Sequence, residues 1–209
     1  MRYGMIIDLD RCIGCDACTM ACKQANGTPK GTFWSKVERN ETGVYPDAYT
    51  EYVPTLCMHC KNAACVDACP YGVSVYAADG TVQILSEMCV GCNYCVAACP
   101  YGARTFDFGE WKTYYPEKEK TAYEGIQEAC QPYRNTVSKC TLCKDRRDKG
   151  DAPACVHTCP TDARTFGDLE SSGMQTLLQS RQAYQLKPEA GTDPSVYYLP
   201  RKLRSQRNY

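Results

Sequence analysis

The sequence lacks long apolar runs and has few large aromatic side chains. Only 4 of its 209 residues are Phe and 2 are Trp, and the mean hydropathy is −0.48. No stretch approaches the roughly 18 apolar residues that a helix needs to span a bilayer. We therefore expect no membrane span, and a hydrophobic core that is small for a chain of this length.

An excess of charge of either sign is also missing, because 24 Lys and Arg residues balance 24 Asp and Glu residues. Proteins that bind nucleic acid usually concentrate basic residues, so we expect no nucleic-acid partner. The first residues, MRYGMIIDLDRC, contain neither a long apolar stretch nor a twin-arginine pair. We therefore expect no export signal on this chain.

Cysteine, by contrast, is abundant, and all but one of the 17 cysteines fall into four runs of four. The runs are Cys12, Cys15, Cys18 and Cys22; Cys57, Cys60, Cys65 and Cys69; Cys89, Cys92, Cys95 and Cys99; and Cys140, Cys143, Cys155 and Cys159. Disulfides would require an oxidising compartment, whereas CxxC pairs without a secretion signal are more often metal or redox motifs. Structural zinc is usually held by two CxxC pairs in a closed tetrahedron, which three cysteines at three-residue spacing do not suit. The spacing favours iron–sulfur clusters.

The third run, followed by Pro100, matches the bacterial ferredoxin pattern C-x2-C-x2-C-x3-C-P in full. The second run has two extra residues before Cys65, the fourth has eleven residues between Cys143 and Cys155, and Lys23 replaces the proline after the first run. Since every run supplies four cysteines, the sequence predicts four 4Fe–4S clusters with a thiolate on every iron. Closed clusters of this kind transfer single electrons. No GxGxxG or CxxxCxxC motif indicates a catalytic centre, so we expect the chain to have no enzymatic activity of its own.

Short secondary-structure elements are predicted between these runs. An alternating apolar pattern predicts a strand over 2–8, and residues 16–26 predict a helix that ends at Gly27. Residues 73–85 predict a hairpin around Asp79 and Gly80. Further short helices are expected at 62–68, 93–98 and 173–183.

An internal repeat predicts how the runs are paired. CPYG at 69–72, CPYGARTF at 99–106 and CPTDARTF at 159–166 are copies of one exit segment, and ARTF is identical in the last two. Each copy closes half of a two-cluster ferredoxin. The second and third runs are neighbours and form one such unit, which leaves the first and fourth runs to pair with each other across it.

The predicted fold class is therefore α+β, with two bacterial-type ferredoxin-like domains of two 4Fe–4S clusters each, one inserted in the other. The expected parts are 1–50 and 139–170 for the split domain, 51–108 for the inserted domain, 109–138 for an insertion or linker, and 171–209 for a C-terminal docking tail. From Leu186 onward the apolar residues of this tail have no predicted strand or helix to pack against, so we expect them to dock on a partner.

The four runs, the start YGMIIDLDRCIGC and the exit CPTDARTFGDL resemble the iron–sulfur electron-transfer (beta) subunits of the dimethyl sulfoxide reductase family of molybdenum or tungsten bis-pterin oxidoreductases. The resemblance covers essentially the whole chain. The stretches YVPTLCMHC and LKPEAGTDPSVYYL look closest to the small subunits of respiratory arsenate reductases and catechol dehydroxylases. Some relatives replace the second cysteine of the third run and hold a three-iron cluster, whereas Cys92 is present here.

This resemblance implies a function and partners. Subunits of this family relay electrons to or from a large molybdopterin-type catalytic subunit, with a membrane quinol-oxidising subunit or a soluble electron donor as a second partner. The alternative is a polyferredoxin-like relay subunit of a hydrogenase or formate-linked complex. The resemblance also implies assembly in the cytoplasm and export in the folded state with a partner that carries a twin-arginine signal; the alternative is a protein that stays in the cytoplasm.

The resemblance and the symmetry of the repeat together imply crossed ligation, in which the last cysteine of each run binds the cluster of the paired run. The resulting ligand sets are site 1 (Cys12, Cys15, Cys18 and Cys159), site 2 (Cys22, Cys140, Cys143 and Cys155), site 3 (Cys57, Cys60, Cys65 and Cys99) and site 4 (Cys69, Cys89, Cys92 and Cys95).

Five other side chains are candidates for lesser roles. Cys130 belongs to no run and is expected to be a free thiol. His59 and His157 lie within runs and are expected to sit near clusters without binding iron. Tyr71 and Tyr101 each follow a Cys-Pro pair and are expected to shield clusters from water.

Overall fold

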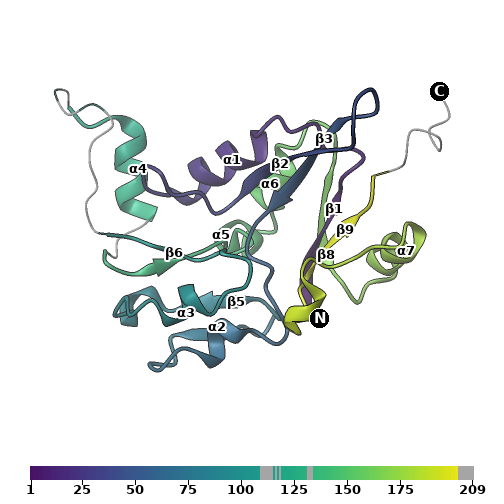
Figure 1. The fold of residues 1–209 in the computed structure, drawn as a ribbon. Coiled ribbons are helices and arrows are strands. Elements are labelled where there is room, and N and C mark those ends of the chain that lie inside the picture. Colours follow the sequence, from purple (N-terminus) through teal and green to yellow (C-terminus); the bar gives the residue numbers. More distant parts are fainter. Residues whose placement is uncertain (109–114, 116, 118, 131–133, 202–209) are drawn as a thin grey trace.

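The computed structural model describes residues 1–108, 115, 117, 119–130 and 134–201 (Figure 1). The strands are β1 (Tyr3–Asp8), β2 (Lys36–Thr42), β3 (Tyr49–Thr55), β4 (Ser74–Tyr76), β5 (Val82–Ile84), β6 (Thr105–Phe106), β7 (Val137–Ser138), β8 (Arg164–Asp168) and β9 (Val196–Leu199). The helices are α1 (Ala17–Asn26), α2 (Ala64–Asp67), α3 (Tyr94–Ala97), α4 (Ala122–Cys130), α5 (Lys144–Arg147), α6 (Ala154–His157) and α7 (Ser172–Ser180), with short 3-10 turns η1 (Ser86–Met88) and η2 (Pro188–Ala190). The predicted strand, hairpin and helices are confirmed as β1, β4 with β5, α1, α2, α3 and α7. The result is a mixed α and β fold of short elements.

β1 is the central strand of a three-stranded sheet in the order β8-β1-β9. It runs antiparallel to β8, where Ile7 lies opposite Arg164, and parallel to β9, where Met5 lies opposite Val196. Met5, Ile6 and Ile7 are all buried. A strand covered on both faces needs such a continuous apolar run, which explains why three large apolar residues follow one another in this strand.

The main hydrophobic core joins this sheet to the cysteine-bearing loops. Met5, Ile7 and Tyr198 belong to one buried cluster with Leu56 and Met58. The same cluster contains the cysteines Cys18, Cys22, Cys57, Cys140 and Cys155. The thiols therefore occupy positions that larger apolar side chains fill in an ordinary domain, which agrees with the scarcity of Phe and Trp.

Helices that belong to different cysteine runs pack against each other. α1, in the first run, packs against α6 in the fourth, and α2, in the second run, packs against α3 in the third. Figure 1 shows the second pair together at the lower left. The contacts thus join the first run to the fourth and the second to the third. The domain boundaries remain predictions, and β3 spans the position expected between residues 50 and 51.

The sequence did not predict the β2–β3 hairpin or α4, which lies in the segment expected to be an insertion or linker. β2 reads KVERNET and buries only Val37, so it carries no apolar alternation. α4 is held by long-range contacts: Gln127 Nε2 donates to the Thr28 carbonyl at 2.8 Å, and the Tyr123 hydroxyl donates to the Lys23 carbonyl at 3.1 Å. Part of this insertion (109–114, 116, 118 and 131–133) lies outside the described residues.

The expectation that the chain from Leu186 onward has no element of its own to pack against is wrong. Val196–Leu199 form β9 at the edge of the sheet, and Val196 and Tyr198 are completely buried. The Tyr198 hydroxyl donates to the Pro54 carbonyl at 2.8 Å. A four-residue strand is too short to show periodicity, and its pairing with β1 is decided by contacts across the whole chain. This part of the tail therefore belongs to the core and is not free to dock on a partner.

Candidate metal centres

The four cysteines of site 1 line one cavity together with Arg164. Cys12, Cys15 and Cys18 lie between β1 and the first turn of α1, whereas Cys159 follows α6. Burial raises the pKa of Cys12; the backbone N–H of Gly14 lowers it, and the charges of Cys18 and Cys159 raise it further. The structure thus brings the last cysteine of the fourth run to the first three cysteines of the first run.

The four cysteines of site 4 line a second cavity, together with Arg104 and Tyr71. Burial raises the pKa of Cys95; Arg104 lowers it, and the charges of Cys69 and Cys89 raise it further. Cys92 is exposed. This set likewise combines three cysteines of one run with the last cysteine of its partner.

The cysteines of site 2 are all buried. Asn26 Nδ2 lies 3.6 Å from Cys22 Sγ and 3.8 Å from Cys143 Sγ, although these cysteines are far apart in the sequence. Burial raises the pKa of Cys22 well above its ordinary value, and the charges of Cys140, Cys155 and Cys143 raise it further. The last cysteine of the first run therefore lies with the fourth run.

Site 3 is partly buried. Burial raises the pKa of Cys60 to about 12; the Thr192 hydroxyl opposes the rise, and the charges of Cys57, Cys65 and Cys99 add to it. All four predicted sets are thus neighbours in space. Within the described ranges, no three His, Cys, Asp or Glu side chains are placed to hold a single metal ion; a 4Fe–4S cluster does not require this, because its thiolates bind four separate irons.

Backbone N–H groups of two exit segments point at the cysteine that begins each segment, which is the last cysteine of its run. The Ala163 N–H donates to Cys159 Sγ at 3.3 Å. Burial raises the pKa of Cys159, but the backbone N–H groups of Thr161 and Ala163 outweigh this effect and lower it. In the same way, the N–H groups of Ser74 and its neighbours lower the pKa of Cys69 against the effect of burial. Such donors stabilise a thiolate and tune a metal centre bound to it.

Two glycines in the Cys-x-Gly-Cys turns allow the backbone to approach closely. Gly14 and Gly91 have φ values of +70° and +68°. A Cβ atom on Gly14 would lie 2.4 Å from Tyr52 Cδ1, and one on Gly91 would lie 2.3 Å from the Asn135 carbonyl oxygen. Both positions therefore require glycine, for conformation and for space.

Two buried arginines that the sequence analysis did not single out contact the sites. Arg104 Nη2 donates to Cys65 Sγ at 3.0 Å, and Arg164 Nη2 donates to Cys18 Sγ at 3.3 Å. They occupy the same place in the two ARTF copies at 103–106 and 163–166. This identity was the signal that could have found them.

These surroundings fit 4Fe–4S clusters. Each site offers four thiols, and a cluster held by four thiolates carries a charge of about −2 when oxidised. The N–H groups and buried arginines offset such a charge. Arg104 Nε is buried and has no hydrogen-bond acceptor among the described residues. A sulfide of a bound cluster would supply one. When bound, clusters of this kind accept and release single electrons.

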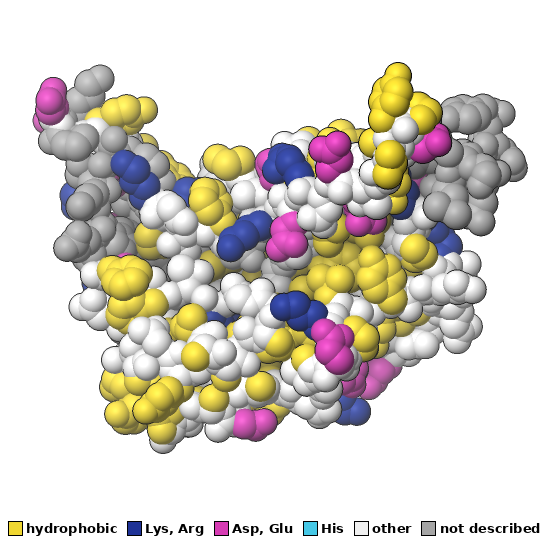
Figure 2. Space-filling model, viewed as in Figure 1, with side chains coloured by type: hydrophobic (Ala, Val, Ile, Leu, Met, Phe, Trp, Pro, Cys, Tyr) yellow, Lys and Arg dark blue, Asp and Glu magenta, His cyan; other side chains and the backbone are white. Residues whose placement is uncertain are grey.

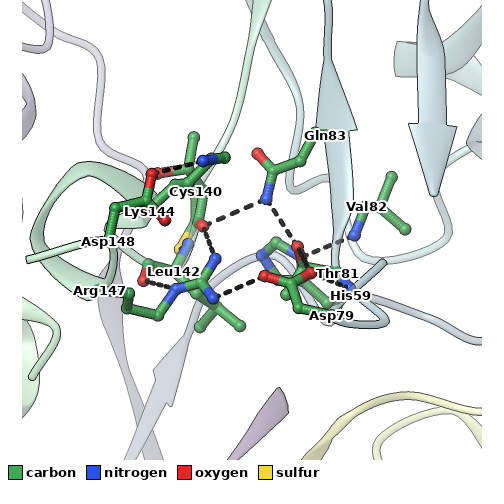
Figure 3. A network of polar contacts seen from close by, with 11 residues as sticks. His59, Asp79, Thr81, Val82, Gln83, Cys140, Leu142, Lys144, Arg147 and Asp148 are labelled. Carbon is green, nitrogen blue, oxygen red and sulfur yellow. Dashed lines mark hydrogen bonds and ion pairs between the residues drawn. The ribbon is translucent and has the colours of Figure 1, made fainter. Parts of the chain in front are cut away.

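A polar network connects the loop of the fourth cysteine run, which carries three cysteines of site 2, to the β4–β5 hairpin (Figure 3). Arg147 Nη1 lies 2.7 Å from Asp79 Oδ2, and these side chains are only 6% and 19% exposed. Arg147 Nε also donates to the Leu142 carbonyl at 2.8 Å. Gln83 Nε2 donates to Thr81 Oγ1 at 2.8 Å. The network thereby joins the loop of the fourth run to the hairpin between the second and third.

His59 is fully buried in the same network, where the Val82 N–H donates to its Nδ1 at 3.1 Å (Figure 3). Burial lowers the pKa of His59 well below its ordinary value, and the charges of Lys139 and Arg147 lower it further. The ring is therefore neutral at physiological pH, and its Nδ1 acts as a hydrogen-bond acceptor. This placement supports a structural role beside the second run.

The other candidates of the sequence analysis have different surroundings. His157 is exposed at the end of α6, and Cys130 is exposed at the end of α4, in none of the four sets. Tyr71 lines the site 4 cavity and remains exposed. The Tyr101 hydroxyl lies 2.7 Å from Thr192 Oγ1, beside site 3.

Replacing Asp79 with asparagine is expected to lower the free energy of unfolding by about 3 kcal/mol, because it leaves the buried charge of Arg147 without its partner. At neutral pH Asp79 is charged, since Thr81 and Arg147 hold its pKa below the ordinary value against the effect of burial. Thermal unfolding of the anaerobic protein measures the change. Asp151→Asn is the control, because the Arg146–Asp151 pair is exposed and 3.9 Å apart, and its loss should cost less than about 1 kcal/mol. Equal midpoints for the two variants would contradict the role of the network.

Comparison with protein families gives two matches, both to models described as a 4Fe–4S dicluster domain. One covers residues 48–133 and 113–169, and the other covers 11–73. Together they include all four cysteine runs. In the part of the chain that the structure describes, no helix has the length and apolar character needed to cross a bilayer.

The chain is similar over nearly its whole length to several known proteins, among them subunits of respiratory reductases. It is 36% identical to the arsenate respiratory reductase iron–sulfur subunit ArrB of a Shewanella species, over 95% of this chain and 96% of the relative. It is 38% identical to a subunit of the selenate reductase of Mesobacillus selenatarsenatis, over 95% and 72%, and 38% identical to the protein NrfC of Escherichia coli, over 97% and 82%. With this identity and coverage, the chain belongs to the iron–sulfur subunits of the dimethyl sulfoxide reductase family of molybdoenzymes, which are the electron-transfer subunits of these oxidoreductases.

Proposed function

We propose that this electron-transfer subunit holds four 4Fe–4S clusters, one in each of sites 1 to 4, and relays single electrons through them to or from a large molybdopterin-type catalytic subunit. The observation that carries the proposal is the assembly of every cysteine of the four runs into sets of four, each drawn from two runs. The ligands are those of the crossed arrangement, with the last cysteine of each run on the partner cluster.

We infer the order of the clusters along the relay from electrostatic interactions between neighbouring sites. Burial raises the pKa of Cys155 in site 2; Arg164 lowers it, and the nearby charge of Cys18 in site 1 is among the groups that raise it. Burial also raises the pKa of Cys140 in site 2, and the charge of Cys57 in site 3 contributes. Sites 3 and 4 meet at Arg104. These contacts support the linear order 1, 2, 3, 4.

Sites 1 and 4 are then the points where electrons enter and leave. Cys15 in site 1 and Cys92 in site 4 are exposed, whereas all of site 2 is buried. Exposed apolar side chains accompany both ends, with Ile13 beside Cys15 and Val90 and Tyr94 near Cys92. Figure 2 shows apolar side chains gathered at the lower left, where α2 and α3 lie in Figure 1. We propose that the catalytic subunit docks at one end, and a membrane quinol-oxidising subunit or a soluble electron donor at the other.

The partner is proposed to be a catalytic subunit of the arsenate reductase or catechol dehydroxylase type, and the similarity to ArrB supports the first. We also propose that the chain is assembled in the cytoplasm and exported in the folded state with a partner that carries a twin-arginine signal. Fractionation of cells tests the export: the iron-loaded chain should reach the periplasmic fraction only when this partner and its signal are present.

Anaerobically purified protein is expected to contain about sixteen iron and about sixteen acid-labile sulfide ions per chain, four of each for every set of four cysteines. Colorimetric iron and sulfide assays, with metal analysis for zinc, provide the measurement. A content of about twelve irons, stoichiometric zinc, or a three-iron signal in untreated protein would each contradict the four-cluster proposal.

A further inference from the structure

Arg104 and Arg164 are buried charges in equivalent positions. Arg104 is only 4% exposed to solvent, and Arg164 is only 3% exposed. Arg104 donates to Ser74 Oγ at 2.7 Å and to Cys65 Sγ at 3.0 Å. Arg164 donates to Ser35 Oγ at 3.1 Å and to Cys18 Sγ at 3.3 Å. Each arginine therefore has one serine hydroxyl and one cysteine sulfur as close partners.

A buried guanidinium needs a negative partner to offset the loss of hydration. In the described part of the chain, no carboxylate forms an ion pair with Arg104 or Arg164. The nearby groups that can carry a negative charge are the cysteine sulfurs, which are thiolates when they bind iron. The sites beside them are therefore the only source of countercharge that these surroundings provide.

Each arginine faces two sites. Arg104 donates a hydrogen bond to Cys65 of site 3 and also lines the cavity of site 4. Burial lowers the pKa of Arg104, but the charges of Cys65 and Cys95 outweigh this effect and raise it. Arg164 donates a hydrogen bond to Cys18 of site 1 and lines the site 1 cavity. Burial lowers the pKa of Arg164, but the charges of Cys155 in site 2 and Cys18 in site 1 outweigh this effect and raise it. In both cases the two cysteines whose charges raise the pKa of the arginine most are the third cysteines of paired runs.

We propose that Arg104 is a counterion shared by the clusters of sites 3 and 4, that Arg164 is the equivalent counterion of sites 1 and 2, and that each arginine raises the reduction potentials of both its clusters. This inference rests on the proposed four-cluster function. Each cluster accepts one electron, which takes its charge from about −2 to about −3. A fixed positive charge and its hydrogen bonds to the thiolate sulfurs favour the more negative state, so they make reduction easier.

The test is a redox titration of the full-length protein, purified anaerobically and followed by electron paramagnetic resonance. Four variants are compared with the unchanged protein: Arg104→Gln, Arg164→Gln, Arg104→Lys and Arg164→Lys. Glutamine keeps a hydrogen-bond donor but removes the charge, whereas lysine keeps the charge on a different geometry. Arg104→Gln is expected to shift two of the four midpoint potentials downward and leave the other two unchanged. Arg164→Gln is expected to shift the other two, and each lysine variant to show a smaller shift of the same pair.

Iron analysis accompanies every titration. If the unchanged protein lacks about sixteen irons or four titrating components, the four-cluster proposal fails, and the shared counterions fail with it. If the unchanged protein meets both conditions, the counterion proposal is overturned by an iron-replete glutamine variant that shifts no potential, a single potential, or all four alike. Should a glutamine variant lose iron, the corresponding lysine variant decides by the same pairing rule.

Discussion

Replacing Cys22 with serine is expected to disturb the cluster of site 2 and to leave that of site 1 intact, although Cys22 follows the three site 1 cysteines in one uninterrupted run. Cys18 and Cys22 lie on successive turns of α1. The first lies in the site 1 cavity, and the second lies beside Cys140 and Cys143 of the fourth run. One helical turn therefore separates cysteines of two different sites, and under the proposed crossed ligation the loss of Cys22 acts on the cluster of site 2.

Iron counting in two backgrounds measures this effect without assigning spectra to individual clusters. A Cys140→Ser and Cys143→Ser protein is expected to have lost site 2, so adding Cys22→Ser should remove no further iron. A Cys12→Ser and Cys15→Ser protein is expected to have lost site 1, and there Cys22→Ser should cause a further loss. Cys159→Ser is the matched control, with the opposite pattern in the two backgrounds. Further loss from Cys22→Ser in the first background alone would refute crossed ligation.

Local signals in the sequence predicted much of this fold. The strand β1 was predicted from the alternation of residues 2–8, and the end of α1 was predicted from Gly27, which takes the left-handed conformation with a φ of +54°. The turn at Asp79 and Gly80 indicated the β4–β5 hairpin. The pairing of the runs was predictable as well, because the repeated exit segments carry the ferredoxin symmetry in the sequence itself.

The features that the sequence did not predict depend on residues that are distant in the chain. α4 is held by the loop after α1, and β9 is held by β1, which comes from the other end of the sequence. The roles of Arg104 and Arg164 depend on the distances between cysteines of different runs. The repeated ARTF was visible, but only the fold places its arginine between two sites.

Deleting residues 196–209 is expected to abolish folding and iron binding together, and not merely docking to a partner. The deletion removes β9, including Val196 and Tyr198, which are fully buried, and Leu199, which is nearly so. Burying side chains of this size contributes about 1.5–3 kcal/mol each, or about 4.5–9 kcal/mol for the three. That is comparable with the entire free energy of unfolding of a typical domain, about 5–15 kcal/mol. The deletion also exposes the edge of β1 and leaves the Pro54 carbonyl without its hydrogen bond from the Tyr198 hydroxyl.

The control is a shorter deletion of residues 202–209, which keeps every residue of β9 and is expected to retain the full iron content. Both proteins are expressed under the same anaerobic conditions, and soluble yield and iron per chain are compared. A protein that ends at Ser195 yet keeps all its iron would mean that β9 contributes little to the core. The interface with the catalytic subunit would then have to be sought again in the tail, and no longer at the exposed cysteines of sites 1 and 4.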